Sequence, residues 1–181
     1  MNKIMVTIAK DVLCEKREQG YDAFLEFILD EYKEKVGKDL TSEALSQLPS
    51  DVITLWAYSI VQQEVSDGGF IQLIHNGYGP FIFDNPFAKA MRLWGLKDFS
   101  KYIYKAKKLY DEHKNALTVE CGDEDFMALF EQHPQFDDLD DEFIEMEEEV
   151  TDAIAQYVEK NIGLFCMTDA ISGTSGSDPS L

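Results

Sequence analysis

The strongest chemical signal in this chain comes from its carboxylates and their spacing. Residues 121–159 hold 15 Asp and Glu residues and no Lys or Arg, so this segment contributes −15 to a formal net charge of −19. Carboxylates three or four residues apart on a helix stand about 5–6 Å from one another. Duplex DNA carries one phosphate charge per about 1.7 Å of its axis. A helical row of carboxylates can therefore offer Arg and Lys side chains a substitute for DNA phosphates.

An apolar stripe predicts that the acidic residues from Asp138 to Glu159 lie on one long helix. Apolar residues recur there at spacings of three and four, which gives the helix a continuous face for packing. This stripe consists of Leu139, Phe143, Met146, Val150, Ile154 and Tyr157. On the remaining surface, four pairs of like charges four residues apart cost the helix about 1–2 kcal/mol in total. Selection for stability alone would have placed lysines among them.

Two functions fit this dense acidic surface. The first is binding of a basic partner through a phosphate-like array, with an affinity that falls steeply as salt rises. The second is a solvated face that keeps the protein soluble. For the first function, Glu145, Glu148, Glu149 and Asp152 are expected to share one face. The full set of candidate partner-binding residues is Asp123, Glu124, Asp125, Asp137, Asp138, Asp141, Glu142, Glu145, Glu148, Glu149 and Asp152.

The rest of the chain also has the periodicity of helices, and we predict an all-α fold. Apolar residues recur at helical spacings in 24–32, 52–61 and 99–110. No run of alternating apolar and polar residues predicts a strand. We expect residues 1–165 to form a single compact multi-helix domain that ends in the long acidic helix. Residues 166–181, which are rich in Ser and Gly, are expected to form a flexible tail.

Glycines divide the middle of the chain. A helix that begins near Ser50 should break at Asp67-Gly68-Gly69. The short apolar segment that follows, residues 70–74, should end at His75-Asn76-Gly77. Residues 77–84 are expected to form a loop that lays aromatic side chains on the core.

Composition excludes several classes of protein. The strong negative charge argues against direct binding to nucleic acid or to an anionic membrane. The three cysteines, Cys14, Cys121 and Cys166, contain no C-x-x-C pair and predict no disulfide framework. The apolar run Ile4–Ala9 is shorter than a secretory h-region of roughly 7–15 residues, and no stretch approaches the roughly 20 residues of a membrane span. We therefore expect a protein of the reduced cytoplasm.

No motif indicates an enzyme, a metal site or a cofactor. His75, His113 and His133 are isolated from one another and from cysteine in the sequence. There is no phosphate-binding glycine loop. The acidic stretch 137–142 lacks the glycine and the spaced ligands of a calcium-binding loop. We therefore expect no catalytic residue, no cofactor and no metal.

A second motif surrounds the glycines in the middle of the chain. Its residues are Glu64, Asp67, Gly68, Gly69, Phe70, Gln72, Asn76 and Gly79. In this pattern the chain resembles a family of small bacterial proteins, long described as a domain of unknown function, whose named member is a DNA-mimic protein. The family pattern is an acidic residue, Asn/Asp-Gly-Gly-Phe, a Gln two positions on, and Asn-x-x-Gly. The resemblance covers roughly residues 40–162 and extends through 88–95, 136–140 and 157–161.

The resemblance implies an all-α fold and binding to a DNA-binding regulator in place of DNA. The expected partner is therefore a basic DNA-binding protein, such as a transcriptional regulator. The motif residues themselves are expected to serve the fold. Gly68 and Gly69 can turn one helix into the next, because glycine adopts backbone conformations that side chains forbid. Phe70 should fill the core, while Glu64 and Gln72 should bond to the backbone of the turn.

Two alternatives remain open from the sequence. An inhibitor or immunity-type protein for a basic nuclease would use the same acidic surface on an enzyme. A neutral scaffold or small-molecule module would instead use a cleft near His75, Tyr78, Phe81 and Phe83.

Overall fold

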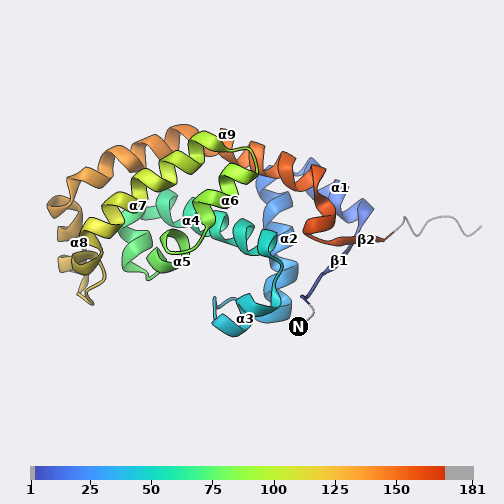
Figure 1. Cartoon of the computed structure of the whole chain (residues 1–181), viewed down its shortest axis with the longest axis horizontal. Helices are drawn as coiled ribbons and strands as arrows, with labels where there is room; N and C mark the ends of the chain where they lie inside the picture. Colours follow the sequence, from blue (N-terminus) through green and yellow to red (C-terminus); the bar gives the residue numbers. More distant parts are fainter. Residues whose placement is uncertain (1–2, 170–181) are drawn as a thin grey trace, which may run out of the picture.

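The computed structural model describes residues 3–169, and most of them are helical (Figure 1). The helices in chain order are α1 (Lys10–Glu18), α2 (Tyr21–Val36), α3 (Ser42–Gln47), α4 (Ser50–His75), α5 (Gly79–Phe83), α6 (Phe87–Leu93), α7 (Lys97–Leu117), α8 (Asp123–Gln132) and α9 (Asp137–Lys160). The shorter elements are the strands β1 (Thr7–Ala9) and β2 (Met167–Asp169) and the 3-10 turns η1 (Pro134–Phe136) and η2 (Ile162–Leu164). The predicted all-α single domain with a long acidic C-terminal helix is confirmed.

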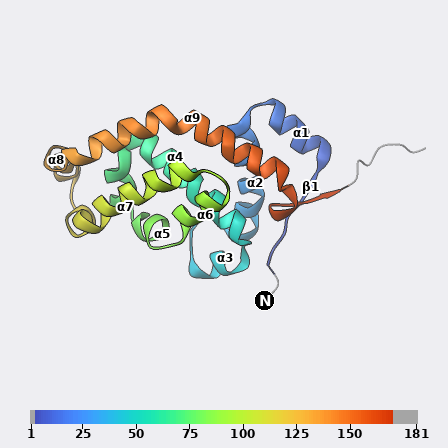
Figure 2. The ribbon, with the colours of Figure 1, turned by 45° about the horizontal axis from the view of Figure 1, so that its top comes forward.

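The long helix α9 runs along one side of the molecule for most of its length (Figure 1). Helices α4 and α2 pack against it, and α4 also packs against α5, α6 and α7. Helix α8 lies at one end, while α1 and the strands lie at the other (Figure 2). None of the helices within residues 3–169 is long and apolar enough to cross a bilayer.

The core surrounds α4, whose apolar residues cover most of its circumference. Aromatic rings connect α4 to the two long helices beside it. Tyr102 of α7 packs on Phe70 of α4, with ring centroids 5.9 Å apart, and on Phe143 of α9, with centroids 6.3 Å apart. All three side chains are buried. This aromatic contact joins the middle of α4 to the first half of the acidic helix.

Helix α4 consists of two helical segments joined at a kink. Gly68 has φ −157° and ψ 20°, and Gly69 has φ 72° and ψ −177°, so neither residue is helical. The backbone angles of Gly69 are accessible to glycine and to almost no other residue. The break predicted at Asp67-Gly68-Gly69 is confirmed.

The structure differs from the expectation of a flexible tail that begins at residue 166. Cys166 is buried, and β2 pairs in parallel with β1, Thr7 lying opposite Met167. Strands of three residues are too short to leave a pattern of alternation in the sequence. Residues 166–169 therefore belong to the folded domain, and the remainder of the predicted tail, 170–181, lies outside the described residues.

Residues 79–83 form the short helix α5 where the sequence predicted a loop. Pro80 suits the first turn of a helix because its missing N–H has no intrahelical role there. The side-chain amide of Asn85 donates to the carbonyl of Phe81 at 3.1 Å and satisfies the last turn. One such turn gives no periodicity, which is why the sequence did not reveal it.

Candidate acidic binding surface

Between Asp138 and Asp152, the outer side of helix α9 carries seven carboxylates, which we call the acidic row. The row consists of Asp138, Asp141, Glu142, Glu145, Glu148, Glu149 and Asp152. At about 100° per residue, these positions fall within about 120° of the helix circumference. Glu142 and Asp152 are partly buried and the other five are exposed. The apolar stripe on the opposite side packs on α4, so the helix is held with the row toward solvent.

The middle of the acidic row lines a shallow groove of about 530 Å³. Its lining residues are Glu145, Glu148, Glu149, Asp152, Ala153 and Gln156. The four carboxylates among them are the ones whose spacing predicted a common face. Because their oxygens are acceptors, the groove suits a group that donates several hydrogen bonds and carries positive charge, such as a guanidinium.

Almost none of the charge in the acidic row is offset by neighbouring cations. Lys105 of α7 reaches Glu142, with Nζ 2.5 Å from Oε2. Among residues 3–169, no Lys or Arg lies within 4.0 Å of the other six carboxylates of the row. The mutual repulsion of the row therefore persists in the folded protein.

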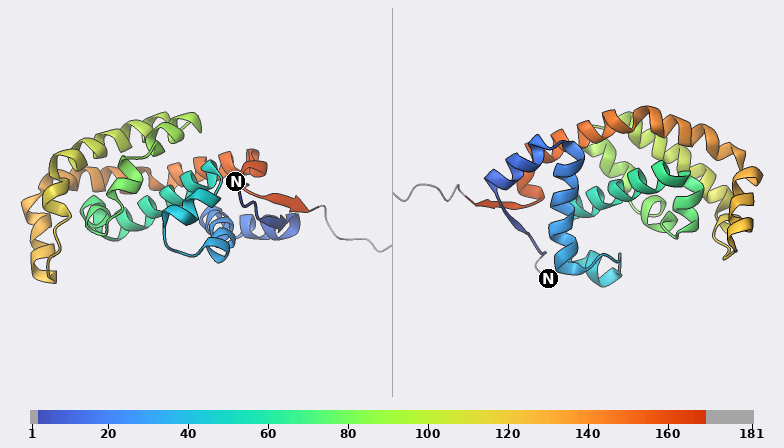
Figure 3. Two further views of the ribbon diagram at one scale, coloured as in Figure 1. Left: turned by 60° about the horizontal axis from the view of Figure 1, so that its bottom comes forward. Right: turned by 180° about the vertical axis from the view of Figure 1, so that it is seen from behind.

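The other predicted acidic residues lie apart from the centre of the row. Asp123, Glu124 and Asp125 are exposed in the first turn of α8, where negative charge is favourable. The opposite end of α8 leads into η1 and α9, so the helix carries these residues about 15 Å away from that junction (Figure 3). Asp137 is exposed and directly precedes the row. The structure thus divides the candidate residues into the row and a separate acidic turn.

Three polar residues of α9 face the protein interior, and we call them the inward polar row. They are Asp140, Glu147 and Thr151. They lie about 140° around the helix from the centre of the acidic row. Glu147 Oε1 accepts from the amide of Gln62 at 2.6 Å and from the Thr151 hydroxyl at 2.9 Å. The Thr151 hydroxyl also bonds the buried Tyr58 hydroxyl at 2.6 Å.

Asp140 meets the kink in α4. Its Oδ1 accepts from the backbone N–H of Phe70 at 2.9 Å. A Cβ on Gly69 would stand 2.1 Å from Asp140 Oδ2, so the carboxyl fits there only because Gly69 has no side chain. Burial raises the pKa of Asp140 to about 6, and the charges of Asp137 and Asp141 act in the same direction. The spacing of residues in the sequence indicated no role for Asp140, although both segments that meet here belong to the pattern of resemblance.

The other motif residues also serve the fold, but in a different way from the one expected. Glu64 Oε2 accepts from the amide of Gln72 at 3.1 Å and from the amide of Asn76 at 2.8 Å. These side chains bond to one another across the kink rather than to the backbone of the turn. Gly79 is buried and Asp67 is exposed.

Comparison with known proteins places these features in a family. A family model described as "DMP19-like protein" matches residues 46–161 of the chain. The chain belongs to the DMP19-like family. It is also 34% identical over 157 residues to "DNA mimic protein DMP19" of Neisseria meningitidis serogroup B (strain ATCC BAA-335 / MC58). That match covers 86% of this chain and 92% of the relative. The resemblance inferred from the sequence is confirmed.

The segment shared with the DMP19-like family contains the kink, Asp140 and the acidic row, and it also contains two further features. One is a histidine pair. Gln135 brings His113 and His133 together, with its Nε2 3.0 Å from His113 Nε2 and 3.2 Å from His133 Nδ1. Burial lowers the pKa of His133. No three His, Cys, Asp or Glu residues within 3–169 are grouped to hold a metal ion.

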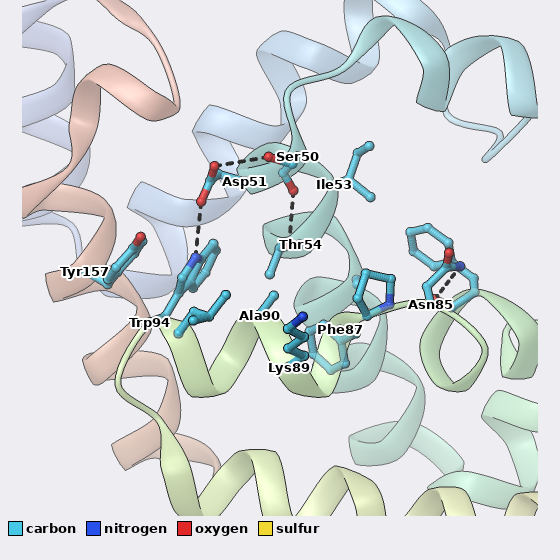
Figure 4. Close-up of a pocket in the computed structure, with 14 residues that line it drawn as sticks. Ser50, Asp51, Ile53, Thr54, Asn85, Phe87, Lys89, Ala90, Trp94 and Tyr157 are labelled. Carbon is cyan, nitrogen blue, oxygen red and sulfur yellow. Dashed lines mark hydrogen bonds between the residues drawn. The ribbon is translucent and has the colours of Figure 1, made fainter.

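The other feature is an apolar pocket of about 570 Å³ between α4 and α6 (Figure 4). Trp94 stacks on Tyr157 with ring centroids 4.5 Å apart, and its indole N–H donates to Asp51 Oδ1 at 3.2 Å. Figure 4 shows these three side chains at one end of the pocket and Asn85 at the other.

The aromatic cleft considered in the sequence analysis does not form as one site. Phe83 is buried and stacks on Tyr110, with centroids 4.8 Å apart. His75 packs on Phe126 and bonds to the carbonyl of Leu117. Tyr78 and Phe81 line another pocket, of about 690 Å³, and Phe81 also lines the pocket between α4 and α6.

Proposed function

We propose that this protein binds a basic DNA-binding protein through the acidic row and occupies the surface that would otherwise hold DNA. The partner is a transcriptional regulator of the cytoplasm, and the mechanism is competition without catalysis. One observation supports this proposal above the others. Six carboxylates of the acidic row lie on one face of α9 and lack a cationic neighbour within residues 3–169. Their mutual repulsion lowers the stability of the helix.

The physical chemistry of the row suits a partner that recognises phosphates. Carboxylates spaced about 5–6 Å apart can each accept from a separate Arg or Lys, much as successive phosphates do. The groove between Glu145, Glu149 and Asp152 provides several acceptors for one guanidinium. The rest of the protein holds α9 by its opposite side, so binding requires no rearrangement of the fold.

Family membership supports the same proposal. The relative from Neisseria meningitidis is named a DNA mimic protein, and its similarity extends across most of both chains. The family model runs from residue 46 to residue 161 and therefore spans the whole of α9. A shared function would place the acidic row at the centre of the interface.

The proposal is tested by capturing the partner and reversing charges in the row. The protein is immobilised, incubated with lysate of its source organism at low salt, and eluted with excess duplex DNA. The expected result is a DNA-binding protein that both DNA and salt release. The triple variant E145K/E148K/E149K should reduce its capture by about 100-fold or more, because several charge-assisted contacts are lost together.

A charge-matched control separates the row from the net charge. The variant E18K/E34K/E43K reverses three exposed carboxylates on α1, α2 and α3 and changes the net charge by the same amount. It should capture the partner as well as the unmodified protein does. Equal loss in both triple variants, or no loss in the first while its circular dichroism stays helical, contradicts the proposed surface. A captured nuclease in place of a regulator would favour the inhibitor alternative.

A further inference from the structure

The kink in α4 creates a backbone donor that its own helix cannot satisfy. The N–H groups in the first turn of a helical segment have no acceptor within that segment. Phe70 begins the second segment of α4, and its side chain is fully buried. Its N–H donates to Asp140 Oδ1 at 2.9 Å, so a residue of another helix provides what an N-cap residue normally provides locally.

The glycines before Phe70 make room for this contact. Gly69 has a positive φ of 72° and lies where a side chain would overlap the Asp140 carboxylate. At Gly68, an added Cβ would stand 2.1 Å from Oε1 of Gln72. Gln72 in turn donates to Glu64. The Gly-Gly-Phe sequence therefore shapes a recess on α4 that receives one carboxyl from α9.

Neighbouring positions on α9 are held by two different helices. Asp140 is bound to α4, and the carbonyl of the preceding residue, Leu139, accepts from the Tyr102 hydroxyl of α7 at 2.7 Å. Two adjacent contacts with different helices fix the rotation of α9 about its own axis, and not only its distance from α4. The acidic row lies about 140° around the helix from Asp140, so this rotation determines where the row points.

We propose that Asp140 is the positioning residue of the acidic row: by capping the second segment of α4 from α9, it sets the rotation that presents the row to solvent. The positioning role rests on the proposed function, because it concerns the binding of a basic partner. The capping role concerns the fold alone. The Asp140 side chain is turned toward α4, away from the acidic row.

The titration of the Asp140 carboxyl makes its contact with Phe70 measurable. Besides burial, the groups that act on the pKa of its carboxyl are the Phe70 N–H of α4, which lowers it, and Asp137 and Asp141 on α9, which raise it. Tyr102 of α7 also lies close enough for the charge of Asp140 to raise the pKa of that hydroxyl. Burial raises the pKa of Asp140 to about 6. The protonated carboxyl keeps an oxygen that accepts from Phe70, so an asparagine side chain should replace it.

Two variants and two measurements test the proposal. Asp140→Ala removes the acceptor, whereas Asp140→Asn keeps one. Hydrogen exchange of the Phe70 amide reports the cap, and fluorescence anisotropy of a labelled arginine-rich peptide at low salt reports the acidic row. We expect Asp140→Ala to accelerate exchange at Phe70 by on the order of tenfold and to weaken peptide binding several-fold. Asp140→Asn should stay within about twofold of the unmodified protein in both.

A pH titration tests separately whether the Asp140 carboxyl accepts from the Phe70 N–H in solution. In the unmodified protein the amide proton shift of Phe70 should titrate with a midpoint near 6, and in Asp140→Asn that step should vanish. If Asp140→Ala does not fold, this titration still tests the contact on which the proposal rests. Absence of the step in the unmodified protein, or peptide binding and exchange unchanged in Asp140→Ala, overturns the proposal. If the unmodified protein binds no peptide, the proposed function fails. Hydrogen exchange at the Phe70 amide then still tests whether Asp140 caps the second segment of α4.

Discussion

The acidic row and the inward polar row lie on the same helix and both contain Asp and Glu side chains, yet the surroundings of these carboxylates are opposite. Glu148 and Glu149 are exposed and have no cationic neighbour within residues 3–169. Glu147, beside them, accepts from Gln62 and Thr151, and Asp140 accepts from the backbone of Phe70. The inward carboxylates hold the helix in place. The outward ones repel one another, and within residues 3–169 only Glu142 among them pairs with a cation of a neighbouring helix.

This difference separates two reasons for which a protein keeps an acidic residue. Removing an inward carboxylate leaves buried donors without acceptors, which destabilises the fold. Removing an outward one relieves repulsion, which should stabilise it. Stability measurements can therefore distinguish the two rows without any knowledge of the partner.

The largest effect is expected at the recess that receives Asp140. Gly69→Ala should lower the free energy of unfolding by about 3 kcal/mol or more, because it combines an unfavourable backbone conformation with overlap of the Asp140 carboxylate. Gly77→Ala is the matched control. Gly77 also has a positive φ, of 86°, but an added Cβ would meet nothing within 4 Å. It should cost about 1–2 kcal/mol in urea denaturation, and equal losses in the two variants would show that Asp140 does not press on Gly69.

This recess also marks the limit of what the sequence could predict. The Gly-Gly pair predicted the break in α4, because glycine is the usual residue where a helix must turn. Nothing in the local sequence indicated that the break would be capped by a residue 70 positions away in the chain. A carboxylate on α9 differs from its neighbours only through the donors that the tertiary fold brings to it. The spacing of the apolar stripe predicted the outward face correctly, since that property depends on helix geometry alone.

The second contact of the inward polar row predicts a smaller loss. The Gln62 amide donates to Glu147 Oε1 at 2.6 Å and to Asp22 Oδ1 at 2.8 Å. Gln62→Ala should therefore destabilise the protein by about 1–2 kcal/mol, because Glu147 then keeps only the Thr151 hydroxyl. Gln63→Ala, at the exposed position next to it, should change the stability by less than about 0.5 kcal/mol. A loss in Gln63→Ala as large as that in Gln62→Ala would contradict the role of this bond.

The pH dependence of stability should isolate Asp140. Its pKa is raised from 3.8 to about 6 by folding, so the native state binds the proton more tightly than the unfolded state. The stability contributed by this group is present below about pH 4 and is lost as the pH rises through 6. Relative to the unmodified protein, Asp140→Asn should therefore gain about 1–2 kcal/mol between pH 4 and pH 7, less than the full shift implies because water still reaches the carboxyl. Chemical denaturation across this range measures the difference, and a constant difference would refute the raised pKa.

The smallest expected effect is a gain in stability at the acidic row, and it bears most directly on the comparison of the two rows. Glu145 has like charges four residues away on both sides, Asp141 and Glu149, so Glu145→Gln removes two repulsive pairs. The free energy of unfolding should rise by about 0.4–1 kcal/mol at low salt, and the gain should shrink as salt screens the charges. Glu112→Gln on α7 is the control, because no Asp or Glu stands three or four positions from Glu112, and it should give no such gain.

Partner binding should change in the opposite direction from stability. The same Glu145→Gln variant should capture less of the DNA-binding partner, because one acceptor of the groove has lost its charge. If the face serves only solubility, the Glu145→Gln variant should be more stable and should capture as much partner as the unmodified protein does. A gain in stability joined to a loss of capture is therefore the combination that assigns the acidic row to binding, and a gain in stability with unchanged capture would return it to a solvated surface.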